Sequence, residues 1–192
     1  MTASLTIRPI QEWLPQLNNP LLIAGPCSLE SEEQAVSTAK LLAKDHRVFI
    51  YRGGVWKPRT RPGSFEGVGS IGLKWLKAVR EETGLPVSTE VANAQHTEDA
   101  LKNGIDVMWI GARSTASPFV VQEIADVLKG TDATVMVKNP VNPDIQLWMG
   151  AIERINHAGI KNIVAIHRGF TPFGETKYRN YPNWQTVIEL RR

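Results

Sequence analysis

The sequence VFIYRGGVWKPRTRPGS spans residues 48–64 and joins an apolar run to a basic loop. Its first four residues predict a buried strand. The thirteen residues from Arg52 to Ser64, called the basic loop below, contain four cationic side chains, three glycines and two prolines. Glycines let a backbone approach a ligand closely, and prolines stiffen a loop. The composition therefore indicates an anion-binding loop, with an ordinary solvated surface loop as the alternative.

Alternating strands and helices are predicted on both sides of this loop. The strands are continuous apolar runs, as in buried parallel sheets, at 21–24, 48–51, 86–91, 107–110, 134–137 and 163–166. Helical periodicity predicts helices at 31–44, 71–84, 95–103, 117–128 and 145–158, with a last helix around 184–188. A capping box of Ser31 and Gln34 and a Ser117-Pro118 start support two of them. Four helices are followed by glycines that favour a left-handed stop, namely Gly84, Gly104, Gly130 and Gly159.

This alternation predicts an α/β fold, which leaves a doubly wound sheet and a barrel to be distinguished. The sequence contains neither G-x-G-x-x-G nor G-x-x-x-x-G-K-[ST], the phosphate loops of doubly wound sheets. Instead a polar residue stands at the carboxyl end of every predicted strand: Cys27, Arg52, Glu90, Arg113, Lys138 and Arg168. A TIM (β/α)8-type barrel builds its active site in this way. We therefore predict such a barrel, with about six of its eight β/α repeats present.

The barrel is expected to occupy residues 20–192 as a catalytic domain, and residues 1–19 are expected to form an N-terminal arm. The chain of 192 residues, with 42% hydrophobic and 21% charged residues, suits one globular domain. One cysteine excludes an internal disulfide framework, and the sequence has neither a signal peptide nor an apolar run of membrane-spanning length. A cytoplasmic protein without a membrane partner is expected. The net charge of +3 is too small to indicate nucleic-acid binding.

Cationic side chains are predicted to converge at the mouth of the barrel. They are Arg52, Lys57, Arg59, Arg113, Lys138 and Arg168. So many like charges in one cleft need anions to neutralise them, so phosphorylated small molecules are the expected substrates. Trp56 is expected to line the cleft, Trp75 and Trp148 to be core residues, and His46, His96 and His157 to be solvated.

Six motifs in this order resemble the 3-deoxy-7-phosphoheptulonate synthase family over residues 20–190. They are Gly25-Pro26-Cys27-Ser28, Arg52-Gly53-Gly54, Lys57-Pro58-Arg59-Thr60, Ile110-Gly111-Ala112-Arg113, Lys138-Asn139 and His167-Arg168-Gly169. The resemblance implies a transferase that condenses phosphoenolpyruvate with erythrose 4-phosphate in the first step of the shikimate pathway. It also implies a divalent metal of the Mn, Fe, Co or Zn class. A homo-oligomer is expected as well.

The resemblance assigns roles to the phosphoenolpyruvate side of the site. Arg52 and Lys138 are expected to bind chiefly the carboxylate of phosphoenolpyruvate. Arg113 and Arg168 are expected to hold its phosphate, with Gly111 and Ala112 of the same motif also in contact with substrate.

The same resemblance assigns the other side to the basic loop. Lys57, Pro58, Arg59 and Thr60 are expected to bind erythrose 4-phosphate, and Lys57 is also a candidate proton donor to the aldehyde oxygen. Glu90 is expected near the reacting carbons, and Cys27 is expected to be a metal ligand. A lone cysteine is otherwise more often a small core residue.

The sequence departs from the family's pattern after the sixth strand. Three further metal ligands of the family, a His, a Glu and an Asp, have no counterpart, and neither do the seventh and eighth strands. His167 is expected to be a wall residue and not a ligand. The chain alone is therefore open to two interpretations, an enzyme or a non-catalytic phosphosugar-binding half-barrel.

A sister family provides the nearest alternative activity. 3-Deoxy-octulosonate 8-phosphate synthase uses arabinose 5-phosphate, and its loop typically reads K-A-N-R-S with a neutral residue in place of the Arg of G-A-R. The segment Lys57-Pro58-Arg59-Thr60 and Arg113 favour the shorter sugar. The resemblance also makes a longer parent protein, carrying a chorismate mutase domain, an expectation that nothing in these residues tests.

Overall fold

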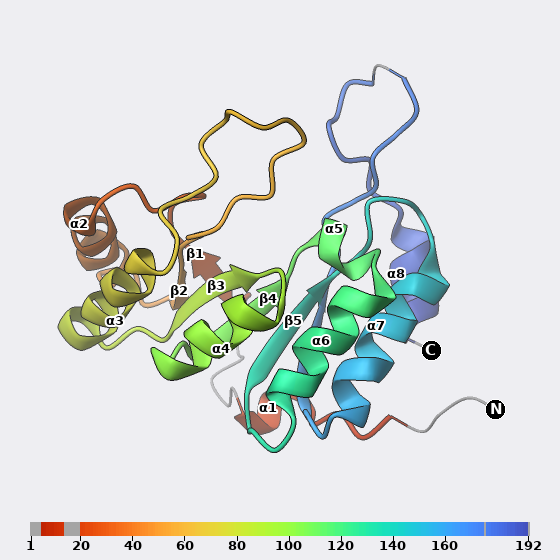
Figure 1. Cartoon of the computed structure of the whole chain (residues 1–192), viewed down its shortest axis with the longest axis horizontal. Coiled ribbons are helices and arrows are strands. Elements are labelled where there is room, and N and C mark those ends of the chain that lie inside the picture. The colour runs from red at the N-terminus through yellow and green to blue at the C-terminus, as the bar shows by residue number, and fades with distance from the viewer. Residues whose placement is uncertain (1–4, 14–19, 175, 192) are drawn as a thin grey trace. The chain divides into compact units, whose positions relative to one another are not determined.

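The computed structural model describes residues 5–13, 20–174 and 176–191. Contacts divide the chain into two compact units (Figure 1). The N-terminal unit comprises Pro9–Val91 and Gln95–Trp109. The C-terminal unit comprises Met1–Arg8, Ala92–Ala94 and Ile110–Arg192. Each unit is described by itself.

The N-terminal unit alternates strands with helices. In chain order its elements are α1 (Ile10–Trp13), β1 (Leu22–Ala24), α2 (Glu32–Leu42), β2 (Val48–Arg52), α3 (Ile71–Thr83), β3 (Val87–Val91), α4 (Ala94–Lys102) and β4 (Val107–Ile110). The strands lie in the order in which they occur in the sequence, and β1 pairs with β2, and β2 with β3, in parallel. The four strands predicted for this part of the chain are all present, within one residue at each end.

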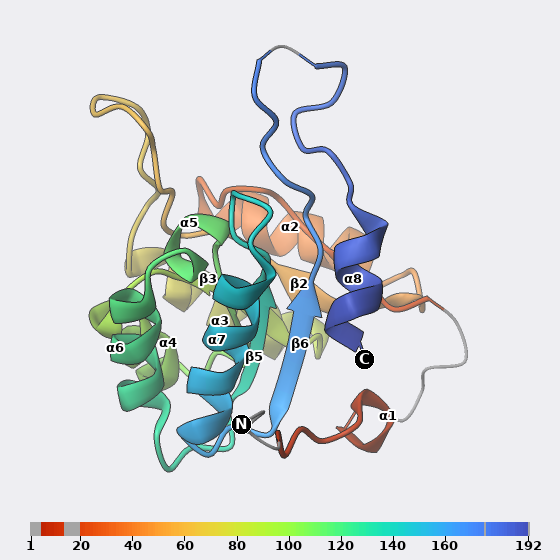
Figure 2. The same cartoon turned by 90° about the vertical axis from the view of Figure 1, so that its right-hand side faces the viewer.

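The C-terminal unit repeats the same pattern. Its elements are α5 (Ala112–Thr115), α6 (Pro118–Leu128), β5 (Thr134–Lys138), α7 (Ile145–His157), β6 (Asn162–Ile166) and α8 (Trp184–Arg191). Strands β5 and β6 pair in parallel along their whole length, from Thr134 opposite Asn162 to Lys138 opposite Ile166. Figure 2 shows α7 and α8 on either side of these strands and a long connection beyond the end of β6. The one-turn helix α5 was not predicted.

The predicted start and stop signals are present. The hydroxyl of Ser31 accepts a hydrogen bond from the Gln34 amide at 3.1 Å and caps α2. The Gln34 side chain reaches one residue further back than a capping box requires, to the amide of Glu30 at 3.0 Å. All four predicted stop glycines have positive φ, as at Gly84, where φ is 72°. These signals explain why the helices end where the next strand begins.

The burial of the side chains differs from the prediction in the first strand and at one tryptophan of α3. Trp148 is 1% exposed, and its indole donates to the Val137 carbonyl at 3.1 Å, so its predicted core position is confirmed. The prediction that the first strand is buried on both faces is wrong, because Leu22 and Ile23 are 38% and 37% exposed. β1 has only β2 as a hydrogen-bonded neighbour within its unit. The expectation that Trp75 is a core residue is wrong as well, because its side chain in α3 is only partly buried.

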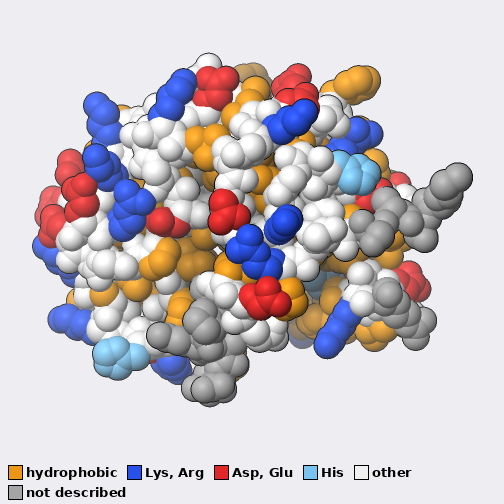
Figure 3. All heavy atoms as spheres, turned by 90° about the horizontal axis from the view of Figure 1, so that it is seen from below, with side chains coloured by type: hydrophobic (Ala, Val, Ile, Leu, Met, Phe, Trp, Pro, Cys, Tyr) orange, Lys and Arg blue, Asp and Glu red, His pale blue; other side chains and the backbone are white. Residues whose placement is uncertain are grey.

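The length and hydropathy of the helices bear on membrane binding, and the distribution of charged side chains on the surface bears on nucleic-acid binding. Among the described residues, none of the helices is both long and apolar enough to cross a bilayer. Figure 3 shows one face from below, on which Lys and Arg side chains alternate with Asp and Glu side chains and with apolar patches. That face carries no continuous positive surface.

Candidate functional site

In the N-terminal unit, Arg52 at the end of β2 is the centre of a cluster of side chains. Its guanidinium donates to the Pro26 carbonyl at 3.1 Å and lies 4.8 Å from the ring centre of Trp109. The indole of Trp109 donates in turn to the Glu90 carboxylate at 2.6 Å. The ends of β2, β3 and β4 thus bring Arg52, Glu90 and Trp109 together. A guanidinium supported from below by an aromatic ring is held in a fixed direction.

Lys57 of the basic loop folds back onto Cys27. Its ammonium donates to the Cys27 carbonyl and lies 3.4 Å from the Cys27 sulfur. Gly54 makes this approach possible, because a Cβ there would lie 2.6 Å from both the Cys27 carbonyl oxygen and the Lys57 nitrogen. Burial raises the pKa of the Cys27 thiol, but Lys57 and Arg52 outweigh it, and the pKa lies below its usual value.

Backbone hydrogen bonds join the start of the basic loop to the segment that follows it. The Lys57 amide donates to the Glu66 carbonyl at 2.8 Å, and the Gly69 amide donates to the Val55 carbonyl at 2.9 Å. Further out, Arg59 Nε donates to the Phe65 carbonyl at 2.7 Å. Figure 1 shows the resulting loop reaching well beyond the end of β2. Its outer part, which carries Pro58, Arg59 and Thr60, is exposed.

Helix α4 contacts the basic loop at Trp56 and the segment that follows the loop at Ser70. The ring of His96 stacks on that of Trp56, with centroids 3.9 Å apart and planes inclined by 6°. Beyond the loop, the Ser70 hydroxyl donates to the Asp99 carboxylate at 2.9 Å. The prediction that His96 is solvated is therefore wrong. Burial lowers its pKa, although Asp99 acts in the opposite direction.

In the C-terminal unit, the predicted residues follow β4 and β5. Gly111 is the N-cap of α5, Ala112 is buried and Arg113 is exposed in the first turn. Lys138 is the last residue of β5 and is partly buried. These residues therefore stand at the carboxyl ends of two strands, as predicted.

Asn139 fixes the backbone of the neighbouring strand end. It is fully buried, and its amide nitrogen donates to the carbonyl oxygens of Pro140 and Gly169 at 2.8 Å and 2.9 Å. Its oxygen accepts a hydrogen bond from the Arg168 amide at 2.7 Å. The Asn139 side chain thus fixes the backbone at both Arg168 and Gly169 through hydrogen bonds.

The Arg168 side chain lies among other cationic groups. Its guanidinium donates to the side-chain oxygen of Asn180 and, at 3.3 Å, to the Gly169 carbonyl. Burial lowers the pKa of Arg168, and the positive charges of Arg179 and Arg113 lower it further. The charges of Arg113 and Arg179 therefore both act on the Arg168 guanidinium. A guanidinium group in such surroundings is suited to bind an anion.

The side chain of His167, which precedes Arg168, packs among aromatic rings. Its neighbours are Trp148, Phe170 and Trp184, with ring centres 5.6 to 6.3 Å away, and its Nε2 accepts a hydrogen bond from the Asn183 amide at 3.2 Å. Burial lowers its pKa.

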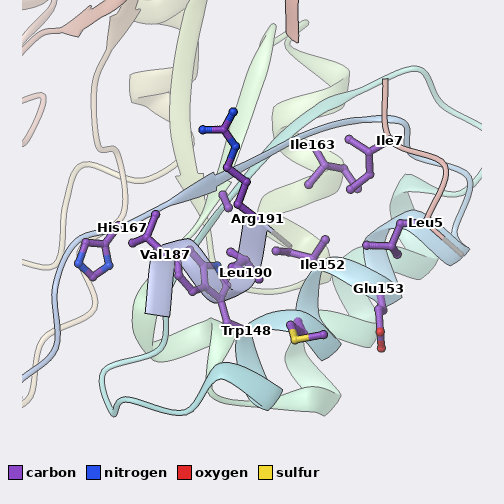
Figure 4. Close-up of a pocket in the computed structure, with 12 residues that line it drawn as sticks. Leu5, Ile7, Trp148, Ile152, Glu153, Ile163, His167, Val187, Leu190 and Arg191 are labelled. Carbon is purple, nitrogen blue, oxygen red and sulfur yellow. The ribbon is translucent and has the colours of Figure 1, made fainter. Parts of the chain in front are cut away.

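His167 also lines an apolar hollow of about 460 Å³ between α7, β6, α8 and the segment that contains Leu5 and Ile7 (Figure 4). Apart from His167, Glu153 and Arg191, its lining is hydrophobic. The hollow therefore does not resemble a site for phosphorylated substrates, and His167 is a wall of this hollow.

The metal-binding prediction finds little support in the described side chains. Within residues 5–13, 20–174 and 176–191, no three His, Cys, Asp or Glu side chains lie close enough to hold a metal ion. The thiol of Cys27 faces an ammonium group instead of further ligands. The described residues by themselves therefore do not fit a divalent metal site, which needs about three protein ligands.

Several site residues were not predicted as such from the sequence. Trp109 and His96 looked like core or surface residues because their partners are distant in the sequence. Arg179 and Asn180 lie in a long connection without periodicity. Asn139 belongs to the Lys138-Asn139 motif, but no role was assigned to it, because its partners at Arg168 and Gly169 are distant in the sequence.

Comparisons with known proteins agree on one family. The sequence profile of the DAHP synthetase I family matches residues 16–190. Phospho-2-dehydro-3-deoxyheptonate aldolase from Thermotoga maritima is 31% identical over 171 residues, which cover 89% of this chain and 48% of that protein. 2-Dehydro-3-deoxyphosphooctonate aldolase from Nitratidesulfovibrio vulgaris (strain DP4) is 30% identical over 177 residues, covering 85% and 62%. The chain thus spans about half the length of the first of these relatives.

Solved structures lead to the same family. The crystal structure of the Thermotoga maritima DAHP synthase has a TM-score of 0.77 and 27% identity, and the match covers 94% of this chain and 54% of that one. A truncated form of that enzyme gives a TM-score of 0.73 with 26% identity, and 68% of it is covered. This likeness confirms the predicted fold class, a TIM-type barrel of which six β/α repeats are present.

Proposed function

Because the chain belongs to the DAHP synthetase I family, we propose that it carries substrate-binding residues of a 3-deoxy-7-phosphoheptulonate synthase. The observation that carries the proposal is that each unit has cationic side chains at the carboxyl ends of its strands. They are Arg52, Lys57 and Arg59 in the N-terminal unit and Arg113, Lys138 and Arg168 in the C-terminal unit. Cations in such positions suit two anionic substrates.

The N-terminal unit is proposed to bind erythrose 4-phosphate and part of phosphoenolpyruvate. Arg52, held between Pro26 and Trp109, would contact the carboxylate of phosphoenolpyruvate. The segment Lys57-Pro58-Arg59-Thr60 would bind the sugar phosphate, and its exposure leaves room for a ligand. Lys57 would protonate the aldehyde oxygen.

The C-terminal unit is proposed to bind the rest of phosphoenolpyruvate. Arg113 and Arg168 would hold the phosphate, with Gly111 and Ala112 alongside, and Lys138 would hold the carboxylate. The lowered pKa of Arg168 supports this assignment, because neighbouring guanidinium groups gain stability when an anion binds between them.

The proposed reaction forms one carbon–carbon bond and one carbon–oxygen bond, the latter to water, and it breaks the carbon–oxygen bond to the phosphate. Carbon 3 of phosphoenolpyruvate attacks the aldehyde carbon of erythrose 4-phosphate, and the aldehyde oxygen takes a proton from Lys57. Water then adds at carbon 2, and inorganic phosphate leaves. The cations contribute by holding two anions in contact and by stabilising negative charge. Glu90, fixed by Trp109, is proposed to lie near the reacting carbons.

The proposal also includes a metal ligand, a cellular location and an oligomeric state. Cys27 is one proposed ligand for a divalent metal of the Mn, Fe, Co or Zn class, and a working metal site would need further ligands from outside the described residues. Residues 1–19 are proposed as an arm of a catalytic domain at 20–192 that acts in the cytoplasm as a homo-oligomer.

A second candidate is the sister activity that uses arabinose 5-phosphate, since one relative at 30% identity is a 2-dehydro-3-deoxyphosphooctonate aldolase. The segment Lys57-Pro58-Arg59-Thr60 and Arg113 favour the tetrose. A third is that the 192 residues bind substrates without turnover, which the lack of a ligand group in the described chain favours.

Calorimetric titration of the 192-residue chain with three ligands tests these readings. We expect binding of phosphoenolpyruvate, and tighter binding of erythrose 4-phosphate than of arabinose 5-phosphate. Loss of phosphoenolpyruvate absorbance on mixing with erythrose 4-phosphate and manganese then separates an enzyme from a binding fragment. A folded chain that binds no phosphoenolpyruvate would overturn the proposal, and a preference for the pentose would select the sister activity.

A further inference from the structure

The connection between β6 and α8 begins as a hairpin that is fixed to the strand end. The Phe170 amide donates to the Tyr181 carbonyl at 2.9 Å, and the Tyr181 amide donates to the Phe170 carbonyl at 2.8 Å. The Thr171 amide donates to the Val141 carbonyl at 2.9 Å and ties the hairpin to the segment after β5. This isolated bridge and the bond to Val141 therefore fix the two ends of the connection next to Arg168. We call residues 169–174 and 176–182 the β6–α8 hairpin.

Gly169 allows the return strand of this hairpin to approach Arg168 closely. Its φ is +80°, and a Cβ there would lie 2.9 Å from the Tyr181 carbonyl oxygen and 3.1 Å from the Asn180 Cβ. The close approach brings the side-chain oxygen of Asn180 to the Arg168 guanidinium. The hairpin thus supplies a polar contact that orients Arg168.

Arg179 precedes Asn180 and adds charge to the same place. Its positive charge lowers the pKa of Arg168, as does that of Arg113. Arg179 is exposed, so it is not needed for packing. Guanidinium groups gathered in this way repel one another unless an anion lies among them.

We propose that the β6–α8 hairpin is part of the phosphate site: Arg179 is a third guanidinium for the anion bound by Arg113 and Arg168, and Asn180 positions Arg168. This inference rests on the proposed function, since it extends the phosphate-binding part of that site. The ligand class is a phosphate monoester dianion, which accepts several hydrogen bonds from guanidinium groups at once.

Titration of the 192-residue chain with inorganic phosphate, and separately with phosphoenolpyruvate, tests the proposal. We expect Arg179→Gln to weaken the binding of both ligands about tenfold, the effect of losing one charge-assisted hydrogen bond. The matched control is Lys177→Gln, which removes an equal charge from the same hairpin, where Lys177 lies 5.5 Å from the Tyr178 ring centre. We expect this control to bind both ligands within about twofold of the unchanged chain.

A salt series separates the charged residue from the positioning residue. Salt screens exposed charges, so Arg179→Gln should lower the dependence of phosphate affinity on ionic strength. Asn180→Ala should weaken binding while leaving that dependence unchanged, because it removes no charge. If Asn180 had a purely structural role, Asn180→Ala would lower the melting temperature without weakening phosphate binding in this way.

The outcomes distinguish the inference from the function on which it rests. If Arg179→Gln binds phosphate as tightly as the unchanged chain, the inference is wrong, while binding of phosphoenolpyruvate and erythrose 4-phosphate still supports the function. If the unchanged chain binds no phosphate, the anion site itself is refuted. If it binds phosphate through Arg179 but does not bind phosphoenolpyruvate, the inference stands and the proposed function fails.

Discussion

At the scale of single residues, Arg59 and Arg113 are proposed to contact different substrates. Arg59 lies in the exposed outer part of the basic loop, and Arg113 lies at the start of α5. We expect Arg59→Ala to weaken erythrose 4-phosphate tenfold or more and to leave phosphoenolpyruvate within about twofold, with the reverse for Arg113→Ala. The size follows from the loss of a hydrogen bond to a charged group, about 1.5–3 kcal/mol. Calorimetric titration of both variants checks it, and equal losses for both ligands in both variants would refute the division.

A second residue-scale prediction concerns stability and the stacked ring of His96. Burial lowers its pKa below the unfolded value of about 6.5, so the neutral ring stabilises the fold above that pH. As the pH falls below 6.5 the unfolded chain takes up the proton first, and stability is lost. We expect the urea midpoint to fall between pH 7.5 and 5.5, and to fall less in His96→Phe, which keeps a flat ring on Trp56.

The control for this prediction is His157→Gln, at an exposed position at the end of α7. It should show the same loss of stability with falling pH as the unchanged chain. A residual loss is expected in His96→Phe, because the pKa of His167 is lowered as well. An unchanged pH dependence in His96→Phe would show that the stacked imidazole does not titrate as its burial implies.

Sequence reasoning located single residues well where a strand end determined their place. Arg52, Arg113, Lys138 and Arg168 all lie at or directly after such ends. It could not identify the partners that hold them, because Trp109 under Arg52 and Asn180 beside Arg168 depend on how separate segments meet. A motif gives the type of side chain, whereas its orientation comes from packing.

At the scale of elements, one crowded glycine lies just after the basic loop, where the chain returns to Val55. Gly67 has a φ of +97°, and a Cβ there would lie 2.1 Å from the Val55 carbonyl oxygen. Gly63 also has a positive φ, of +82°, but nothing lies within 4 Å of a Cβ at that position. A side chain at either position would therefore meet backbone strain, but only a side chain at Gly67 would also collide with a neighbouring atom.

This difference predicts different effects of the same substitution. Gly67→Ala should destabilise the fold by roughly 1–3 kcal/mol and weaken erythrose 4-phosphate binding, because the loop base must open. Gly63→Ala should cost about 1 kcal/mol, the strain alone. Chemical denaturation and titration of both variants provide the measurement. Equal effects would mean that the loop base adapts freely to a side chain.

Elements themselves were largely predictable, since apolar runs and helix stop signals are local. The helix boundaries around Ser31, Gly84 and Gly159 follow from capping and from positive φ. The exposure of β1 was not predictable, because its composition matches that of a fully buried strand. Its neighbours in the sheet, which the run itself does not encode, decide how much of it is covered.

At the scale of the whole molecule, similarity extends over nearly all of this chain but over about half of a curated relative. The six-repeat count made from the sequence is confirmed. The division into two compact units was not predicted, because hydrophobic patterning describes individual elements and not the number of contacts between them. The exposed apolar side chains of β1 are consistent with the expected association of copies, which stays a prediction.

The last prediction concerns metal removal from the whole 192-residue chain. Among the described residues no three potential ligands come together, and Cys27 is in contact with Lys57. Because tight zinc or manganese binding needs about three converging protein ligands, dialysis against a chelator should leave the melting temperature unchanged within about 1 °C. Elemental analysis after gel filtration should find far less than one metal per chain, both before and after Cys27→Ser. Stoichiometric metal whose removal lowers the melting temperature would instead require ligands from outside the described residues or from a second copy, and the binding-fragment interpretation would then lose its main support.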